Sequence, residues 1–578
     1  MSLTLQGIGV SKGIAIGKVH IIRHEPVEIA EYCLPKYALE EEIVRFEEAI
    51  ATARSQLQDI RARAPTNATV DIAAFIDAHL LMLDDSLLTR DPINLIYEHQ
   101  CNAEWALKMQ CDSIVQIFDK MEDPYLSARR SDIEQVIARV QRILRGCSDT
   151  SEQLETYLVN AIVLADDLSP ADTVLMQHHG ILAFATEFGG TTSHTAILAR
   201  SLGIPAIVGL RHAQPYIRPN DTVIVDGLQG VILVDPDERS LRYYRIRKSE
   251  AKRYRATLSK IKNSPTITRD GTQITLHVNI EFPEDMTAVK RVGSSGVGLY
   301  RTEFLFMNRL ELPDEEEHFD AYSRVIRALK GGPVTIRTLD LGADKQIVDS
   351  RYHDGLSATN PALGLRAIRL CLKKPKLFKP QLRAILRASA LGQVRMMIPM
   401  ICGIAEIVQV RLIIDEIRTE LCNNSIKFDP QMPFGIMVEV PAIALCTDLV
   451  APLVDFLSLG TNDLIQYTLA IDRGDEVVNY LYDPVHPAVL RLIKMSIDAA
   501  KNANKPISIC GEMASDCRYV RLLLGLGLRS FSVNPEAFLE VKQIINNSDI
   551  KSLAPLADKM LHATSQTEIA NVLTMVNE

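Results

Sequence analysis

The chain has 578 residues and a formal net charge of −9, and 47% of its residues are hydrophobic. This length exceeds the size of one ordinary hydrophobic core, so we expect two to four domains. The negative charge argues against nonspecific nucleic-acid binding, which draws its affinity from Lys and Arg. No window of about 18 uncharged apolar residues and no basic-then-apolar leader is present, which predicts a cytoplasmic protein without membrane insertion. The ten cysteines show no C-x-x-C spacing, which predicts mostly buried thiols in a reducing compartment.

Residues 36–146 predict a helical subdomain. Between 36 and 63, apolar residues recur three and four positions apart, which places them on one stripe of a long amphipathic helix. Such a stripe needs partner helices to cover it. Three further stretches, separated by breaks at Pro65, Pro92 and Pro124, are expected to supply them: 72–88, 103–120 and 131–144.

An α/β domain is expected in two segments, 1–35 and 147–246, on either side of the helical insertion. Short apolar runs such as 161–164 predict strands, and the pair Asp226 and Gly227 predicts a tight turn between two of them. Strands and turns alternate here with helical stretches, so this part of the chain is expected to form an α/β layer structure.

The C-terminal half predicts a (β/α)8 TIM barrel over residues 266–578. It follows residues 247–265, whose Lys, Arg, Glu and Ser without an apolar stripe predict an exposed helical linker. Eight short apolar runs alternate with helical stretches in this half: 274–280, 296–300, 334–339, 394–398, 434–438, 455–459, 507–510 and 530–533. Polar residues lie at or just beyond the ends of several runs, at the end where such barrels carry their chemistry: Arg301, Arg337, Glu439, Asn462, Asp463 and Cys510.

A histidine lies at a predicted helix N-terminus in the segment GGTTSHTAILAR, residues 189–200. The two glycines allow a turn, and the hydroxyl residues before His194 are suited to cap a helix. Backbone N–H groups and the positive end of the helix dipole favour a phosphate on His194. The same field disfavours protonation and leaves a nucleophilic imidazole. Taken alone, the motif is better explained as a capped turn with an incidental histidine.

The longer stretch from Gly189 to Gly209 resembles the phosphohistidine signature shared by the Enzyme I family of the bacterial phosphotransferase system, pyruvate phosphate dikinase and phosphoenolpyruvate synthase. The resemblance to the Enzyme I family begins at Gly7 and covers nearly the whole chain. It implies phosphoryl transfer from phosphoenolpyruvate to His194 and on to the phosphocarrier HPr, with release of pyruvate. The dikinase and the synthase also need an ATP-binding domain, for which the sequence has neither room nor a glycine-rich phosphate loop.

The same resemblance implies that the hydroxyl of Thr173 orients the imidazole of His194, with an N-cap role as the alternative for this threonine. Thr191 departs from the family pattern, because many relatives carry a larger basic residue at that position. We expect the change to affect phosphate contacts without removing the nucleophile.

A phosphoenolpyruvate site needs several fixed cations, because the substrate carries a carboxylate and a phosphate. Arg301 in GVGLYRTEFL and Arg337 in TIRTLD resemble family motifs whose arginines grip the phosphate. Arg473 matches a third such arginine, and Asn462 matches a residue that contacts substrate. Lys345 is expected near the substrate, with a surface salt bridge as the alternative.

Two carboxylates on neighbouring strand ends, Glu439 in VEVP and Asp463 in GTNDL, suit Mg²⁺, which takes few protein oxygens. The resemblance implies that they are the metal ligands. Cys510 in ICGE matches the family's proton donor to enolpyruvate, and an unperturbed thiol is mostly protonated near neutrality. Segments 360–369 and 381–388 also match family motifs and are expected to form scaffold around the site.

The helical subdomain is expected to dock HPr, because residues 74–84 resemble the family's docking helix. His79 faces either that partner or the apolar stripe, and Arg129 is either a contact or a surface residue. The resemblance also implies a homodimer through the barrel. A regulatory phosphoenolpyruvate sensor on the same fold is the alternative function, disfavoured because every chemical group is retained. His194 cannot face both the barrel and a docked carrier, so the N-terminal half is expected to swivel about the linker.

Overall fold

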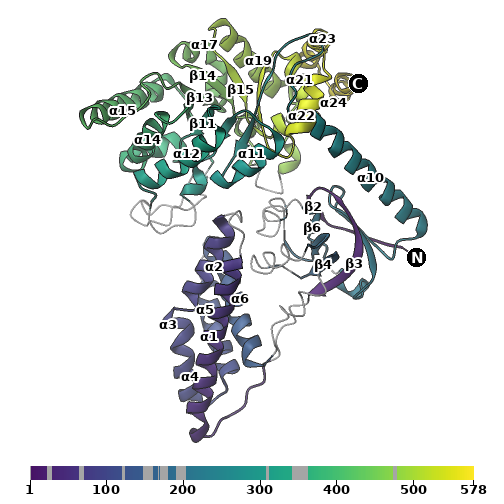
Figure 1. The fold of residues 1–578 in the computed structure, drawn as a ribbon, viewed down its shortest axis with the longest axis vertical. Helices are drawn as coiled ribbons and strands as arrows, with labels where there is room; N and C mark the ends of the chain where they lie inside the picture. Colours follow the sequence, from purple (N-terminus) through teal and green to yellow (C-terminus); the bar gives the residue numbers. More distant parts are fainter. Residues whose placement is uncertain are drawn as a thin grey trace. The chain divides into compact units, whose positions relative to one another are not determined.

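The computed structural model describes residues 2–22, 29–63, 70–119, 124–146, 160–166, 168, 180–189, 199, 204–211, 213–306, 312–341, 362–472 and 478–578. The chain divides into two compact units, Met1–Arg253 and Tyr254–Glu578. Figure 1 shows helices and a β-sheet in the first unit and a strand barrel ringed by helices in the second. None of the helices within the described ranges is long and apolar enough to cross a membrane.

The helices described between residues 39 and 144 of the first unit bury one shared core. They are α1 (Leu39–Arg63), α2 (Val70–Met82), α3 (Ser86–Thr89), α4 (Asp91–His99), α5 (Ala103–Asp119) and α6 (Pro124–Leu144). Phe46, Ala53 and Leu57 of α1 are fully buried and belong to the stripe predicted from the sequence. They pack in one cluster with Ile76 of α2 and Leu107 of α5. Burial of a large apolar side chain stabilises by roughly 1.5–3 kcal/mol, so the shared core holds these helices together.

Helix α4 had no counterpart among the predicted helices. Pro92 lies in its first turn, and Pro124 is the first residue of α6. Proline is tolerated at these positions because the first N–H groups of a helix have no acceptor within the helix. Both prolines therefore begin helices, where the sequence suggested only breaks.

An eight-stranded mixed sheet accompanies the bundle, with the strand order β1-β8-β7-β3-β4-β5-β6-β2. Its strands are β1 (Leu3–Gln6), β2 (Ile8–Ser11), β3 (Ile14–Ile22), β4 (Ala161–Ala165), β5 (Ala183–Thr186), β6 (Ala206–Val208), β7 (Thr222–Asp226) and β8 (Val231–Val234). The chain leaves the sheet after β3 and returns at β4, and these two strands pair in parallel. Every residue of β4, β5 and β6 is buried, as expected for strands covered on both faces.

The turn between β7 and β8 is closed by Asp226, whose side chain is fully buried. Its Oδ1 accepts hydrogen bonds from the backbone N–H groups of Leu228 (3.1 Å) and Gln229 (3.2 Å). Its Oδ2 accepts a hydrogen bond from the Arg247 guanidinium at 2.8 Å. Gly227 is required here because an added Cβ would lie 2.0 Å from the carbonyl oxygen of Ser11. Arg247 belongs to α10 (Glu238–Lys260), so the buried carboxylate ties that helix to the sheet.

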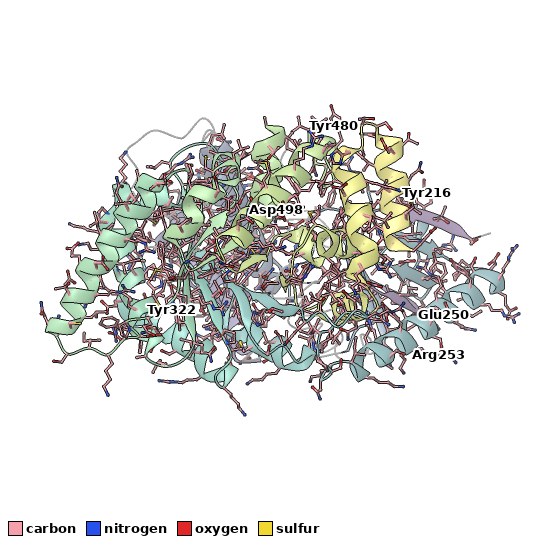
Figure 2. All side chains as sticks on the ribbon, turned by 90° about the horizontal axis from the view of Figure 1, so that it is seen from above. Tyr216, Glu250, Arg253, Tyr322, Tyr480 and Asp498 are labelled. Atoms are coloured by element: carbon pink, nitrogen blue, oxygen red, sulfur yellow. The ribbon has the colours of Figure 1, made fainter. Side chains whose placement is uncertain are left out.

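Helix α10 begins before the linker expected at 247–265, and the boundary between the two compact units falls inside it. Tyr244 near its start and Leu258 near its end are buried, whereas residues 248–257 are exposed. Glu250 and Arg253 lie on this exposed part and point away from the helix in Figure 2. The exposed middle explains the run of charged residues without an apolar stripe.

The second unit is built on a closed barrel of parallel strands in the order β10-β11-β12-β13-β14-β15-β16-β9. They are β9 (Thr275–Ile280), β10 (Val297–Tyr300), β11 (Val334–Arg337), β12 (Val394–Ile398), β13 (Phe434–Val438), β14 (Phe456–Leu459), β15 (Ile507–Ile509) and β16 (Ser530–Val533). Parallel pairing of β16 with β9 closes the ring. These strands match the eight apolar runs, and the predicted TIM barrel is confirmed.

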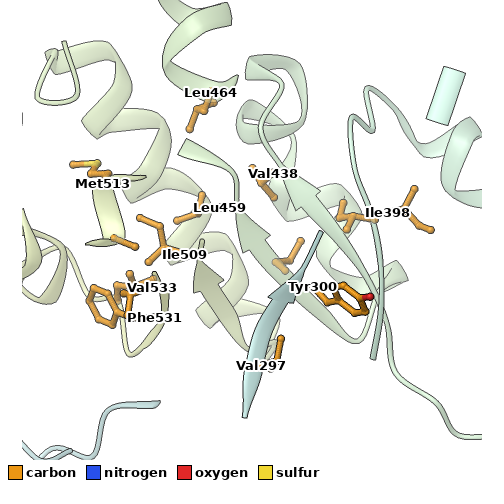
Figure 3. Close-up of a cluster of buried hydrophobic side chains, with 14 of the residues drawn as sticks. Val297, Tyr300, Ile398, Val438, Leu459, Leu464, Ile509, Met513, Phe531 and Val533 are labelled. Carbon is orange, nitrogen blue, oxygen red and sulfur yellow. The ribbon is translucent and has the colours of Figure 1, made fainter. Parts of the chain in front are cut away.

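Helices cover the outside of the barrel. Those in the described residues are α11 (Met286–Val292), α12 (Glu315–Leu329), α13 (Ala367–Lys373), α14 (Pro375–Ser389), α15 (Ile404–Asn423), α16 (Pro441–Leu445), α17 (Thr447–Val450), α18 (Thr461–Leu469), α19 (Pro487–Asn502), α20 (Glu512–Ser515), α21 (Val520–Gly525), α22 (Phe538–Asn546), α23 (Ile550–His562) and α24 (Gln566–Asn577). Figure 3 shows strand side chains such as Val438, Leu459 and Ile509 in the large core that these elements share. Close packing of this kind holds the strand ends in fixed positions.

Substituting Asp226→Ala is expected to destabilise the β7–β8 hairpin by about 3 kcal/mol, because two backbone hydrogen bonds and the hydrogen-bonded ion pair with Arg247 are lost. Hydrogen exchange of the β7 and β8 amides should then accelerate about a hundredfold. Asp226→Asn keeps an oxygen for the turn and should accelerate exchange much less. Exchange in Asp226→Ala at the wild-type rate would contradict this account of the turn.

Candidate active site

A cavity of about 160 Å³ lies at the carboxyl ends of the barrel strands. Its wall comes from residues at or just after β10, β11, β13, β14 and β15 and from the segment before α13. The loops that converge at this end carry the active site in TIM barrels. The polar residues of the wall are Arg301, Glu303, Arg337, Asp340, Arg366, Glu439, Asn462, Asp463, Cys510 and Glu512.

The structure brings together in this cavity the residues that the sequence placed at strand ends. They are Arg301, Arg337, Glu439, Asn462, Asp463 and Cys510. The remaining proposed site residues lie outside the described residues: Thr173, His194, Lys345 and Arg473, together with Thr191.

Arg337, the last residue of β11, is held by two buried carboxylates. It forms ion pairs with Glu303 and, at 2.9 Å, with Asp340 Oδ2. Burial alone would lower the pKa of Arg337, but the neighbouring Glu303 and Asp340 carboxylates raise it. Burial raises the pKa of Glu303, and Arg337 opposes that rise. The guanidinium therefore keeps its positive charge inside the wall of the cavity.

Arg366 lies on the same wall, although the segment 360–369 was expected to be scaffold. It donates to Asp340 Oδ1 at 2.9 Å and to the Tyr467 hydroxyl at 3.3 Å. The Nε atoms of Arg366 and Arg337 are buried without a hydrogen-bond partner in the described part of the chain. Buried donors without partners cost free energy until a ligand accepts from them. Two such guanidinium groups suit an anion with several oxygens, such as a phosphate or a carboxylate.

Asn462 is oriented by the start of α20. Its Nδ2 donates to Glu512 Oε1 at 3.3 Å, and its Oδ1 accepts the Glu512 backbone N–H at 2.8 Å. Across the cavity, Arg301 pairs with Glu281 at 2.7 Å, and both side chains are partly exposed. A partly exposed pair of this kind is worth little, so Arg301 is readily available to a ligand.

Three carboxylates form a cluster in the cavity that could hold a metal ion. One oxygen each from Asp340, Glu439 and Asp463 lies within 4.8 Å of the others, and all three residues are buried. Burial raises the pKa of Glu439 well above its usual value, and the Asp340 and Asp463 charges raise it further. Closely spaced oxygen ligands that repel one another are the donor set of a hard divalent cation. The residues present therefore fit Mg²⁺.

Asp340 was missing from the metal ligands expected from the sequence. It follows Arg337 by three residues in the motif TIRTLD and lies just beyond the end of β11. The strand-end rule that selected Glu439 and Asp463 applies equally to this position. In this motif only the arginine matches a role known in the family, so the resemblance does not mark the carboxylate as a ligand.

Backbone geometry leaves room for the Glu439 carboxylate. Its Oε1 accepts the backbone N–H of Met400 at 2.6 Å, which fixes the side chain in the cavity. An added Cβ at Gly460 would lie 2.6 Å from Glu439 Oε2. Any larger residue at this position would therefore displace the carboxylate from the cluster.

Cys510 lies where the charged cavity meets the apolar interior of the barrel. It packs in one buried cluster with Leu299, Met397, Met437 and Phe456. Burial raises the pKa of the thiol, so it remains protonated at neutral pH, while a hydrogen bond from Ser458 and the Arg337 charge oppose the rise.

Ser458 is a site residue that the sequence did not reveal. Its Oγ lies 3.4 Å from Cys510 Sγ, and the Ser508 hydroxyl donates to Ser458 at 3.1 Å. The contact arises because β14 and β15 pair with Ser458 opposite Ser508. It depends on which side chains point into the barrel, and a short buried strand carries no period that shows this.

Gln381 supports the strand ends from α14. Its Oε1 accepts the backbone N–H of Leu339 at 2.9 Å, and its Nε2 donates to the hydroxyls of Thr302 (2.9 Å) and Tyr322 (3.2 Å). Thr302 in turn donates to the carbonyl of Arg337 at 2.8 Å. This fully buried network fixes the segments that carry the cavity residues after β10 and β11.

In the helical part, His79 of α2 is only 4% exposed and therefore points into the bundle rather than into solvent. Leu81, two residues later, is 70% exposed. The side chain of Arg129 on α6 lies outside the described residues.

Comparisons with known protein families agree with this architecture. Family models match the N-terminal domain of PEP-utilising enzymes over residues 6–129, their mobile domain over 159–230 and their PEP-binding domain over 255–550. The PEP-binding model spans the barrel and the whole cavity. The fold and the cavity thus define a PEP-utilising enzyme.

Curated relatives narrow this class. The phosphoenolpyruvate-protein phosphotransferase of Cupriavidus necator is 44% identical over 99% of both chains. The proteins of the same name from Listeria monocytogenes and Staphylococcus epidermidis are 40% and 38% identical, over 99% and 100% of both chains. The chain belongs to the phosphoenolpyruvate-protein phosphotransferase family, and the resemblance to Enzyme I is confirmed.

Proposed function

We propose that the chain transfers the phosphoryl group of phosphoenolpyruvate to its own His194 and from there to the phosphocarrier HPr, releasing pyruvate in the first step of a sugar phosphotransferase system. One observation carries the proposal: a single cavity combines guanidinium donors, three clustered carboxylates and a buried thiol. Relatives that match this chain over nearly their full length bear the name of that activity.

Substrate binding follows from the charges of the cavity. Phosphoenolpyruvate presents a phosphate and a carboxylate, and Arg301, Arg337 and Arg366 offer planar forks that match both groups. Asn462 adds a neutral donor whose orientation Glu512 fixes. Arg473 and Lys345 are proposed to complete the site, on the basis of their family motifs.

Asp340, Glu439 and Asp463 are proposed to hold Mg²⁺. Such an ion would offset the negative charge of the phosphate and carboxylate oxygens in the bound substrate. The protein's own part is to keep three repelling carboxylates together, which the Met400 N–H and the two buried arginines make possible.

In the first half-reaction, the neutral imidazole of His194 attacks the phosphorus atom. The N–P bond forms as the bond from phosphorus to the enol oxygen breaks, and enolate remains in the cavity. Preorganised guanidinium groups stabilise the charge that spreads over the transferring oxygens. Thr173 is proposed to orient the imidazole.

Pyruvate forms when the methylene carbon of the enolate takes a proton. Cys510 is proposed as the donor, because its raised pKa keeps the thiol protonated near neutrality. The thiolate that remains is stabilised by Ser458 and by the charge of Arg337. It recovers its proton from water after pyruvate leaves. A sensor without turnover is not favoured, because it would need neither this acid nor its support.

The partner and assembly proposals rest on surface features. Leu81 on α2 exposes an apolar side chain on the helix proposed to dock the carrier.

An apolar stripe on helix α15 of the barrel is formed by Ile404, Val408 and Leu412, which are exposed and lie four residues apart. This stripe supports a homodimer through the barrel. Membership of the phosphotransferase family is the ground for a proposed cytoplasmic location. The need of His194 to meet first the barrel and then the carrier is the ground for a proposed reorientation of the two halves between half-reactions.

The proposed function predicts Mg²⁺-dependent labelling by phosphoenolpyruvate that carries labelled phosphate. Label should be acid-labile, pass to added HPr, and disappear in His194→Ala, because a phosphoramidate on that imidazole is the intermediate. Labelled ATP should give no product. Labelling of His194→Ala at the wild-type level, or labelling by ATP, would contradict the proposal.

Metal binding is predicted to weaken as pH falls. The raised pKa of Glu439 means that its proton competes with the cation, so affinity should increase with pH up to that raised pKa and then level off. Isothermal titration with Mg²⁺ should show at least a tenfold loss for Asp340→Asn and for Asp463→Asn. Asp498→Asn, on α19 and paired with Lys494, is the matched control and should bind as the wild type does.

Ser458→Ala is predicted to slow pyruvate formation several-fold, because the product thiolate loses a hydrogen-bond donor. Since that bond lowers the pKa of Cys510, its loss should also move the alkaline limb of the rate profile to higher pH. Rapid quench should show an unchanged burst of phosphorylated protein. Ser508→Ala, which does not touch the thiol, should have a smaller effect. An unchanged alkaline limb in Ser458→Ala would show that Ser458 does not influence the pKa of Cys510.

A further inference from the structure

Two cysteines face each other where the chain reaches the helical bundle. Cys33 lies in the segment before α1, and Cys101 lies between α4 and α5. Their backbones form an isolated antiparallel bridge. Both are free thiols, Cys33 exposed and Cys101 buried.

The hydrogen bonds around the bridge define its geometry. The Leu34 N–H donates to the Gln100 carbonyl at 2.6 Å, so a bond flanks the cysteine pair instead of joining it. In such a non-hydrogen-bonded pair the Cα atoms lie about 4.5 Å apart and the side chains are close. A disulfide spans Cα separations of about 4.4–6.8 Å, so this pair falls within its reach.

Asn102 holds the two segments in register. Its Oδ1 accepts the Tyr32 N–H at 3.3 Å, and its Nδ2 donates to the Ala30 carbonyl at 3.2 Å. The side-chain amide thus adds two attachments beside the backbone bridge. These hydrogen bonds therefore hold the backbones of Cys33 and Cys101 opposite each other.

We propose that Cys33 and Cys101 form a reversible disulfide, which makes this bridge a thiol modification site for low-molecular-mass disulfides. The exposed Cys33 thiolate attacks one sulfur of oxidised glutathione and releases one glutathione thiolate. Cys101, after losing its proton to water, then attacks the Cys33 sulfur and releases the second glutathione. Two electrons pass from the protein thiols to the reagent, and two glutathione thiols carry away the two protons.

The surroundings of the thiols set this order of events. Burial raises the pKa of Cys101, which leaves that thiol a poor nucleophile towards reagents in solution. Within the described residues, its Sγ donates to the Leu95 carbonyl at 3.8 Å. Rotation about the Cα–Cβ bond towards Cys33 therefore costs one weak contact.

The test is incubation of the full reduced chain with oxidised glutathione, followed by peptide mapping without reduction. We expect one linked peptide pair, Cys33 with Cys101, that a dithiol reductant separates. Cys101→Ser should stop at glutathione on Cys33, and Cys33→Ser should leave Cys101 unmodified. Cys422→Ser removes an exposed thiol of the barrel and should leave the linked pair unchanged. Wild type that stops at glutathione on Cys33, or that links only between chains, would overturn the proposal.

A second measurement excludes a link that forms only in unfolded chains. The disulfide closes the loop from 33 to 101 and restricts the unfolded state, so the unfolding midpoint of the bundle should rise by about 5 °C or more on oxidation. The single tryptophan, Trp105 on α5, reports this transition. No rise in the oxidised wild type would overturn the proposal, and Cys33→Ser should show none.

Discussion

Burial of like charges at one end of the barrel is the constraint on which the site depends. Asp340, Glu439 and Asp463 bring three acidic groups within 4.8 Å in a buried place. Removing each charge from water costs several kcal/mol, so the cluster persists only where partners are fixed. Arg337 and Arg366 supply the opposite charge, and both contact Asp340. Fixed geometry is what a closed barrel with a rigid core provides.

The same barrel places a polar environment and an apolar environment next to each other. Above the strand ends, guanidinium and carboxylate groups make the cavity strongly polar. Below them, Leu299, Met397, Met437 and Phe456 form an apolar layer that includes Cys510. The thiol therefore lines the cavity, while its buried surroundings raise its pKa. The position directly after β15 thus combines access to the cavity with a thiol that stays protonated.

Much of the fold could be predicted because its signals are local. Each barrel strand is a short apolar run, and the strand-end rule located Arg337, Glu439 and Cys510 in one cavity before their geometry was known. What escaped depends on pairings between distant segments. Ser458 meets Cys510 through the register of β14 with β15, and Arg366 reaches the cavity from a loop before α13. Neither contact leaves a periodic trace in the sequence.

The helix that begins at Asp91 has a local sequence signal, but that signal is ambiguous. Its signal is local, but Pro92 reads equally as a break or as a helix start, and only packing of Ile96 into the bundle core decides between them. A proline at a boundary therefore locates the boundary without saying which side is helical.

Asp340 belongs to two sets of contacts at once, since it accepts from both arginines and lies within the carboxylate cluster. In the proposed function, an anion that engages the guanidinium groups would loosen their hold on Asp340 and free its oxygens for a cation. A cation bound to the cluster would likewise free the arginines for the anion. Each ligand then increases the binding affinity of the other by the same factor, as thermodynamic reciprocity requires. Substrate and ion would therefore bind to the cavity with positive cooperativity, and each would also bind, more weakly, without the other.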